Sequence, residues 1–218
     1  MPDGISFRKR ISCLGNSKGK PGSIMYKAMK EVGAILAEKR IDISTGAYNG
    51  PGMKAPMEGA KNRNELSVRM GFPFLNRPVN KFVSWKMDCH KLAKSIIFPK
   101  GIIFPGINVP FLGFGIRLVG LLSADGFTIA AGGGIGTFLE FIAIIFFNTK
   151  IWGKTWFKKY YDKKRVVILY PPKAKGIKCW DKNMIQQLID WKFLDKDLIP
   201  LMKIAKTPKE AVAWVLGE

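Results

Sequence analysis

Residues that build metal centres and disulfide frameworks are scarce in this sequence. Its 218 residues include one histidine, His90, and three widely separated cysteines, Cys13, Cys89 and Cys179. No two cysteines form a CxxC pair, and His90 has no second histidine as a partner. We therefore expect no disulfide framework, no metal site and no Ser-His-Asp triad. The same scarcity favours a reducing, cytoplasmic location.

Long hydrophobic runs are also missing. The longest uncharged apolar tract, from Gly101 to Ile116, is interrupted by Pro105 and Pro110. The amino terminus lacks the continuous apolar core of a signal peptide. We therefore expect no transmembrane helix and no stable insertion into a membrane.

Acidic residues are heavily outnumbered by basic ones. Against 36 Lys and Arg there are 16 Asp and Glu, which gives a formal net charge of +20. An excess of this size attracts anionic partners over long distances. The densest basic run, 150–165, is interleaved with tryptophan, phenylalanine and tyrosine. Two interpretations stay open: these side chains bind a nucleic acid or a membrane interface, or the aromatic residues pack on the protein while the lysines face water.

Apolar runs and helical patterns alternate along the chain. Runs typical of buried strands lie at 11–14, 41–45, 125–131 and 165–170, and helical patterns lie at 23–39, near 57–60, and at 138–147, 180–191 and 207–215. This alternation predicts an α/β fold with a doubly wound parallel sheet flanked by helices. We assign one domain to 11–218, after an N-terminal tail at 1–10. The segment 61–114 is harder to assign, and we expect at least one strand in it.

The most informative stretch runs from Gly132 to Glu140 and reads Gly-Gly-Gly-Ile-Gly-Thr-Phe-Leu-Glu. It connects an expected strand to an expected helix. Glycine lets the backbone approach a phosphate closely, and the free N–H groups at a helix start favour phosphate oxygens. The sequence therefore predicts a phosphate-binding turn, with the carboxylate of Glu140 one helical turn further on. Its members are Gly132, Gly133, Gly134, Gly136 and Thr137.

Two further turns follow strands at the same expected edge of the sheet. The first turn contains Gly15, Asn16 and Ser17, and the second contains Gly46, Gly50, Gly52 and Met53. Ligands of parallel sheets bind in the crevice beyond the carboxyl ends of the strands. We therefore expect these residues to complete a nucleotide-binding site, with a core position as the alternative for Met53.

The stretch from Gly132 to Glu140 resembles the hallmark motif of the LOG (lonely guy) family of Rossmann-like proteins, often labelled lysine decarboxylases. That motif reads Pro-Gly-Gly-x-Gly-Thr-x-x-Glu and has an arginine fifteen residues before its first position, where this chain has Arg117. Two positions depart from the family pattern. Gly132 replaces the proline, and Leu118 follows Arg117 where the enzymes usually have lysine. Some relatives with glycine at the first position look like molybdenum-cofactor carriers.

The resemblance implies hydrolysis of the N-glycosidic bond of a nucleoside 5'-monophosphate, AMP-like or a cytokinin riboside monophosphate. The products would be a free base and ribose 5-phosphate, and no cofactor is implied. Glu140 would stabilise positive charge on the ribose or activate water, and Arg117 would orient Glu140 or contact the departing base. The resemblance also implies a homodimer or a higher homo-oligomer. Purely structural roles stay open as well, a helix-start acid for Glu140 and an ion-pair partner for Arg117.

Two functions from other classes stay open. One is a non-catalytic protein that binds or carries a nucleotide or a molybdenum-cofactor-type ligand. The other is nucleic-acid binding through the basic surface, which the charge of +20 favours. A distant resemblance of the expected fold to DNA-processing protein A points the same way.

Overall fold

A computed structural model gives the structure of the protein at residues 8–16, 19–73, 78–97, 109–151, 163–172, 174 and 182–218. Within those residues, seven strands form one sheet in which every neighbouring pair is parallel. The strands are β1 (Arg10–Leu14), β2 (Asp42–Thr45), β3 (Arg69–Gly71), β4 (Trp85–Lys86), β5 (Gly126–Ala130), β6 (Arg165–Leu169) and β7 (Met202–Ala205). The α-helices are α1 (Ile24–Glu38), α2 (Lys54–Arg63), α3 (Cys89–Ile97), α4 (Val109–Leu122), α5 (Ile135–Phe146), α7 (Lys182–Asp190) and α8 (Pro208–Leu216). A π-helix, η1 (Phe147–Ile151), continues α5, and a 3-10 helix, η2 (Lys196–Leu201), precedes β7.

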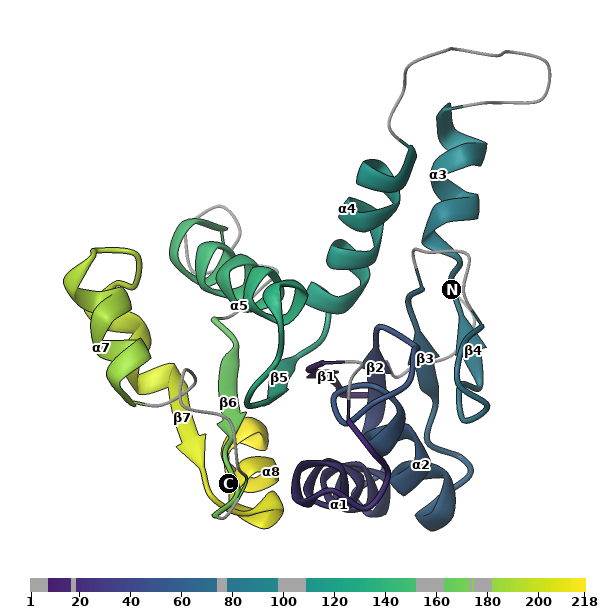
Figure 1. Ribbon diagram of the computed structural model, residues 1–218, viewed down its shortest axis with the longest axis horizontal. Coiled ribbons are helices and arrows are strands. Elements are labelled where there is room, and N and C mark those ends of the chain that lie inside the picture. The colour runs from purple at the N-terminus through teal and green to yellow at the C-terminus, as the bar shows by residue number, and fades with distance from the viewer. Residues whose placement is uncertain are drawn as a thin grey trace, which may run out of the picture.

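Helices cover both faces of the sheet (Figure 1). The helices α1, α2 and α8 lie on one side, and α4, α5 and α7 lie on the other. The strand order is β4-β3-β2-β1-β5-β6-β7, so the chain winds outward from β1 in both directions. The predicted doubly wound α/β fold is therefore confirmed. In such folds the crevice for ligands lies where the strand order reverses, which here is between β1 and β5.

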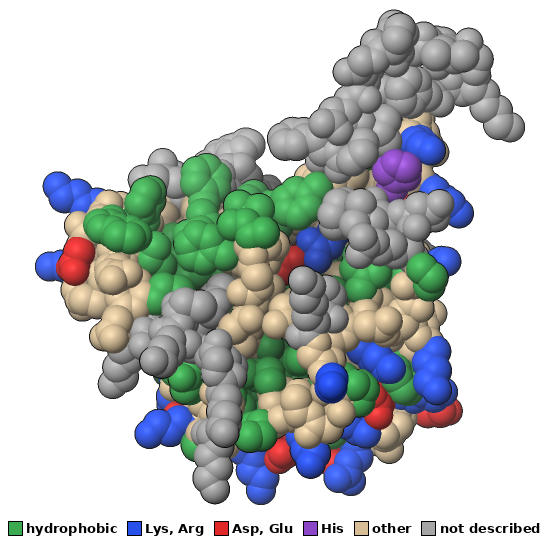
Figure 2. Space-filling view, viewed as in Figure 1, with side chains coloured by type: hydrophobic (Ala, Val, Ile, Leu, Met, Phe, Trp, Pro, Cys, Tyr) green, Lys and Arg blue, Asp and Glu red, His purple; other side chains and the backbone are tan. Residues whose placement is uncertain are grey.

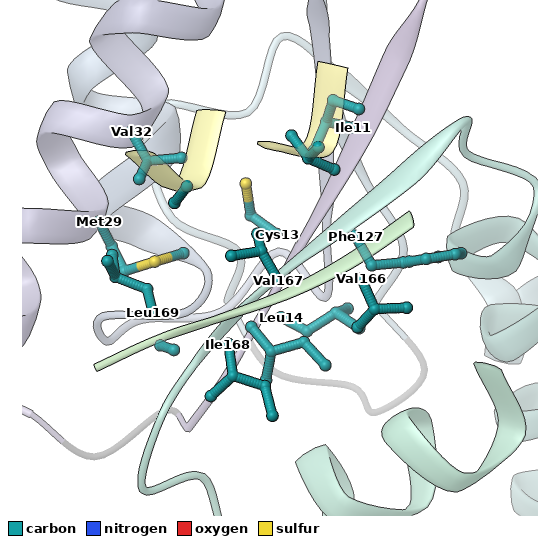
Figure 3. Close-up of a cluster of buried hydrophobic side chains, with 14 of the residues drawn as sticks. Ile11, Cys13, Leu14, Met29, Val32, Phe127, Val166, Val167, Ile168 and Leu169 are labelled. Carbon is teal, nitrogen blue, oxygen red and sulfur yellow. The ribbon is translucent and has the colours of Figure 1, made fainter. Parts of the chain in front are cut away.

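The core lies between the sheet and the two helix layers. Every position of β5 is buried, as are four of the five positions in β1 and in β6. Because helices cover both faces, these strands are apolar runs without the alternation of a half-exposed strand. Figure 3 shows side chains of α1, β1, β5 and β6 packed together, namely Ile11, Cys13, Leu14, Met29, Val32, Phe127, Val166, Val167, Ile168 and Leu169.

Several element boundaries differ from the sequence-based expectations. The helix α5 begins at Ile135, three residues earlier than predicted, so that Gly136 and Thr137 lie in its first turn. The strand β7 was not predicted, and it separates the two helices expected in the tail. The strand β1 begins at Arg10, inside the predicted tail, because Arg10 pairs with Asp42 of β2 in the parallel ladder. The strand expected in 61–114 is confirmed by β3 and β4.

Lys164 is an exception to the interpretation that the lysines of the basic run face water, whereas Lys163 is exposed as that interpretation expects. Lys164 is only 8% exposed, and its ammonium donates to the backbone carbonyls of Leu122, at the end of α4, and of Ala124, just beyond it. The aromatic residues of this run, at 152–161, lie outside the described residues. None of the helices in the described part of the chain is long and apolar enough to cross a membrane.

Candidate functional site

The three predicted glycine-rich turns meet at the carboxyl edge of the sheet. Asn16, after β1, donates its Nδ2–H to the Gly132 carbonyl, after β5, at 3.1 Å. The backbones of Gly15 and Gly52 lie in direct contact, so that a Cβ on Gly52 would overlap the Gly15 main chain. The structure thus brings the first turn into contact with both of the others. Ser17, which the sequence adds to the first turn, lies outside the described residues.

The start of α5 is open toward this edge. Gly134 is the N-cap residue, and as a glycine it has no side chain to cap the first turn of the helix. A Cβ on Gly134 or Gly136 would meet no atom within 4 Å, whereas one on Gly133 would overlap the Thr137 side chain. Free N–H groups at a helix start carry partial positive charge and bind anions. The first turn of α5 therefore has the space and the donors that a phosphate needs.

Arg117 and Glu140 form a buried ion pair next to this helix start. Arg117 lies on α4 and Glu140 on α5, and Arg117 Nη2 lies 2.6 Å from Glu140 Oε1. The two side chains are 8% and 5% exposed. Burial raises the pKa of the Glu140 carboxyl above its usual range, and the charge and hydrogen bond of Arg117 oppose that rise. Perturbed carboxyls of this kind are common at catalytic sites, although structural ion pairs produce them too.

Thr137 and Glu140 lie three residues apart on α5 and are both buried, with 4% of each residue exposed. Residues at this spacing share one face of a helix. The predicted hydroxyl donor and the predicted carboxylate therefore lie on the same side of α5, one turn apart.

The second glycine-rich turn lies directly against the ion pair. A Cβ on Gly46 would overlap Arg117 Nη2 and would lie 2.8 Å from Met53 Sδ. Met53 is 6% exposed and precedes α2. Gly46 is therefore the position that lets Arg117 and Met53 approach the same piece of backbone.

Replacing Gly46 with alanine is expected to lower the free energy of unfolding by about 1–3 kcal/mol, because the added methyl group overpacks the site. The matched control is Gly115→Ala in α4, where a Cβ would meet no atom within 4 Å. Alanine in a helix interior is favoured over glycine by about 0.5–1 kcal/mol, so the control should be neutral or stabilising. Urea unfolding measures both variants. Equal stability of the two would contradict tight packing of Gly46 on Arg117.

Asn80 is a site-supporting residue that the sequence did not reveal. Its Nδ2 donates to the carbonyls of Ala47 and Tyr48 at 2.8 and 3.0 Å. Ala47 has a φ of 71°, a left-handed conformation that is uncommon for alanine, and Thr45 Oγ1 accepts its N–H. Asn80 thereby holds the second turn in a strained shape. Its sequence signal is only a generic Asn turn, in which Asn80 Oδ1 accepts the N–H of Phe82.

Gly132 adopts a backbone conformation that is closed to the proline of the LOG motif. Its φ is 81°, whereas the proline ring fixes φ near about −65°. Gly132→Pro is therefore expected to lower the free energy of unfolding by more than about 1 kcal/mol. Gly134→Ala is the control, since Gly134 has a φ of −79° and open space around it. Thermal unfolding of both variants distinguishes them, and a neutral Gly132→Pro would mean that the turn relaxes to the geometry of the motif.

Cys89 lies near the ion pair at the start of α3. It is fully buried, and burial raises the pKa of its thiol to about 11 although the charge of Arg117 opposes this. A thiol with that pKa is protonated and a poor nucleophile at neutral pH. Within the described residues, His, Cys, Asp and Glu form no cluster of three or more that a metal ion would need.

Comparisons with known proteins define the class of the fold. No protein-family model matches the sequence, and a search of curated proteins finds no match either. Among solved structures, the structural-genomics target TM1055 is 22% identical, with 96% of this chain and 99% of that chain covered and a TM-score of 0.63. The molybdenum cofactor binding protein from the phototrophic bacterium Rippkaea orientalis is 17% identical over 96% of both chains, with a TM-score of 0.57. The molybdenum cofactor carrier protein MCP from Chlamydomonas reinhardtii is 18% identical over 97% of this chain and 99% of that chain, with a TM-score of 0.54. The chain is thus a Rossmann-like α/β protein.

Proposed function

We propose that this protein hydrolyses the N-glycosidic bond of a nucleoside 5'-monophosphate, an AMP-like or cytokinin riboside monophosphate, as its resemblance to the LOG family implies. The observation that carries the proposal is the position of the Arg117–Glu140 pair. It is buried beside the open first turn of α5, with Thr137 and Glu140 one turn apart. A candidate phosphate-binding turn and an acid-base group therefore lie on adjacent turns of one helix.

The 5'-phosphate would bind at the N–H groups of Gly133, Gly134 and Gly136 and at the Thr137 hydroxyl. Each charge-assisted hydrogen bond to the phosphate contributes about 1.5–3 kcal/mol, so a few of them anchor the substrate. The turns after β1 and β2 would then lie over the ribose and the base. Asn16 and Met53 are the residues of these turns that we assign to this contact.

The reaction breaks the bond between ribose C1' and the base nitrogen. The base leaves with the electron pair of that bond and takes up a proton from solvent, and positive charge develops on the ribose; Glu140 later returns to solvent the proton that it accepts. Water attacks C1', and the Glu140 carboxylate accepts the proton of the water as the new C–O bond forms. Arg117 orients Glu140 and opposes its protonation before the reaction. The products are the free base and ribose 5-phosphate.

A comparison of nucleoside 5'-monophosphates with the corresponding nucleosides tests this function. The monophosphates should release their base, and the nucleosides should not, because only the monophosphates reach the donors at the start of α5. Chromatography separates the free base from the substrate. Equal cleavage of nucleosides and monophosphates would exclude the phosphate-binding role of this turn.

A second candidate is a carrier that binds a nucleotide or a molybdenum-cofactor-type ligand without cleaving it. It is favoured by the φ of 81° at Gly132, which sets this turn apart from the proline-containing motif of the enzymes. Two of the similar structures are a molybdenum cofactor binding protein and a molybdenum cofactor carrier protein. A phosphorylated pterin copurifying with the protein, with no turnover of any nucleotide, would support this candidate over the hydrolase.

We also propose that the protein acts in the cytoplasm as a homodimer that pairs through α5. Hydrophobic side chains gather over α5 in Figure 2, and Ile135, Leu139 and Phe146 are 75%, 47% and 51% exposed. Large exposed apolar patches mark interfaces. In a chain of net charge +20, a second copy is least repelled by an uncharged surface.

The variant Phe146→Lys is expected to weaken this dimer at least tenfold, because it places a like charge on each copy in the contact. Light scattering over a range of concentrations measures the change. The control is Leu66→Lys, since Leu66 is 73% exposed but lies beyond the end of α2, away from α5. A wild-type protein that stays monomeric at high concentration would contradict the dimer.

A further inference from the structure

The C-terminal end of α4 is held by side chains of β1 and of the residue just before β6. The last carbonyls of a helix lack partners within the helix and need donors from elsewhere. Here Arg10 and Ser12 of β1 and Lys164, just before β6, donate to carbonyl oxygens in the last turn of α4 and just beyond it. Lys164 makes two of these bonds, to Leu122 at 3.0 Å and to Ala124.

Lys164 is in turn fixed by the end of α5. Asn148 of η1, which continues α5, accepts the Lys164 N–H at 2.8 Å through Oδ1 and donates to the Lys164 carbonyl at 3.0 Å through Nδ2. Asn148 is 2% exposed and Lys164 is 8% exposed. Lys164 therefore connects the C-terminal end of α4 to the C-terminal extension of α5.

The same two helices carry the ion pair of the candidate site. At 1.5 Å per residue, Arg117 lies about 7.5 Å along α4 before Leu122, and Glu140 lies about 12 Å along α5 before Asn148. The helices are thus linked twice, directly by the ion pair and indirectly through Lys164. Catalytic geometry must hold within about half an ångström, and a misplacement of about 1 Å is costly.

Lys164 can hold this link at any pH near neutrality. Burial lowers the pKa of its ammonium to about 8, the charge of Asp125 opposes this, and the charge of Arg10 lowers the pKa further. A neutral amine still has two N–H donors. These two donors are enough for the two carbonyls, those of Leu122 and Ala124.

We propose that Lys164 is a positioning residue for the Arg117–Glu140 pair, which it keeps in register by joining the C-terminal end of α4 to the C-terminal extension of α5. Only the use of this pair in catalysis rests on the proposed function.

The test is the pKa of Glu140 in the full chain without ligand, measured by NMR with glutamate labelled at the side-chain carboxyl. Glu140→Gln identifies the signal. Lys164→Met removes the donors and keeps an unbranched side chain, and Asn148→Ala removes the second anchor. In both variants the pKa of Glu140 should rise by about one unit, because Arg117 no longer sits close enough to oppose the effect of burial. An ordinary core truncation on the other face of the sheet, Val212→Ala, is the control and should leave the pKa unchanged.

An unchanged pKa of Glu140 in folded Lys164→Met and Asn148→Ala would overturn the proposal, as would an equal rise in Val212→Ala. If the wild-type protein hydrolyses nucleotides, kcat of Lys164→Met should fall on the order of tenfold with KM nearly unchanged. If the wild-type protein shows no turnover, the proposed function fails. The pKa comparison still decides the role of Lys164.

Discussion

Replacing Glu140 with glutamine should lower kcat for release of the base by about a thousandfold, within the range seen for loss of a general acid-base group. Glutamine keeps the shape of the side chain but neither carries a negative charge nor accepts the proton of the attacking water. The phosphate donors at the start of α5 are untouched, so the dissociation constant of the nucleotide should change by no more than about threefold. Product chromatography gives the rate, and titration calorimetry gives the affinity.

The matched control is Glu58→Gln. Glu58 lies on α2, where it accepts hydrogen bonds from Tyr26 and Lys30 at 2.6 and 2.7 Å and takes no part in the candidate site. The substitution Glu58→Gln should leave kcat unchanged. Wild-type turnover in folded Glu140→Gln would remove Glu140 from the mechanism.

The second large effect concerns stability. Arg117→Met should lower the free energy of unfolding by about 3–5 kcal/mol at neutral pH, because it leaves the Glu140 carboxylate buried without its partner. The double variant Arg117→Met/Glu140→Gln should recover more than half of this loss, since no charge then remains in the interior. Urea unfolding of the single and double variants gives the coupling between the two residues. Additive losses would contradict the buried ion pair.

The loss in Arg117→Met should depend on pH with a definite sign. Without Arg117, the pKa of Glu140 in the folded state rises still further above its ordinary value of 4.5. A group with a raised folded pKa destabilises the protein progressively as pH rises from its unfolded pKa through its folded pKa. The difference from the wild type should therefore shrink as the pH is lowered from 7.5 toward 5. A difference that grows on acidification would contradict this account of Glu140.

Local signals account for the parts of the fold that the sequence predicted. β5 and β6 are short apolar runs bounded by turn residues, and the helices covering both faces explain why they show no alternation. The helix α4 was not predicted, because Pro110 and three glycines at 113, 115 and 120 interrupt a segment that is apolar on almost every side. The strand β7 was missed because its four residues are mostly half-buried and give little periodic signal.

The candidate site also has a part that the sequence predicted and a part that it did not. Gly132 to Glu140 is contiguous in sequence, so its turn-and-helix geometry follows from the residues themselves, and the spacing of Arg117 came from the family motif. The contacts that support these residues join positions far apart in the chain. Asn80 bonds to a carbonyl 33 positions earlier, and Lys164 bonds to one 42 positions earlier. Single-sequence patterns carry no information on such pairs, and a lysine in a basic run is ordinarily solvent-exposed.

The central claim is that this site cleaves the bond between the base and the ribose. The most direct test is mass-spectrometric analysis of AMP incubated with a stoichiometric amount of the wild-type protein. The account predicts adenine and ribose 5-phosphate in equal amounts, with neither formed by Glu140→Gln. Intact AMP that stays bound, or conversion to adenosine and phosphate, would contradict it.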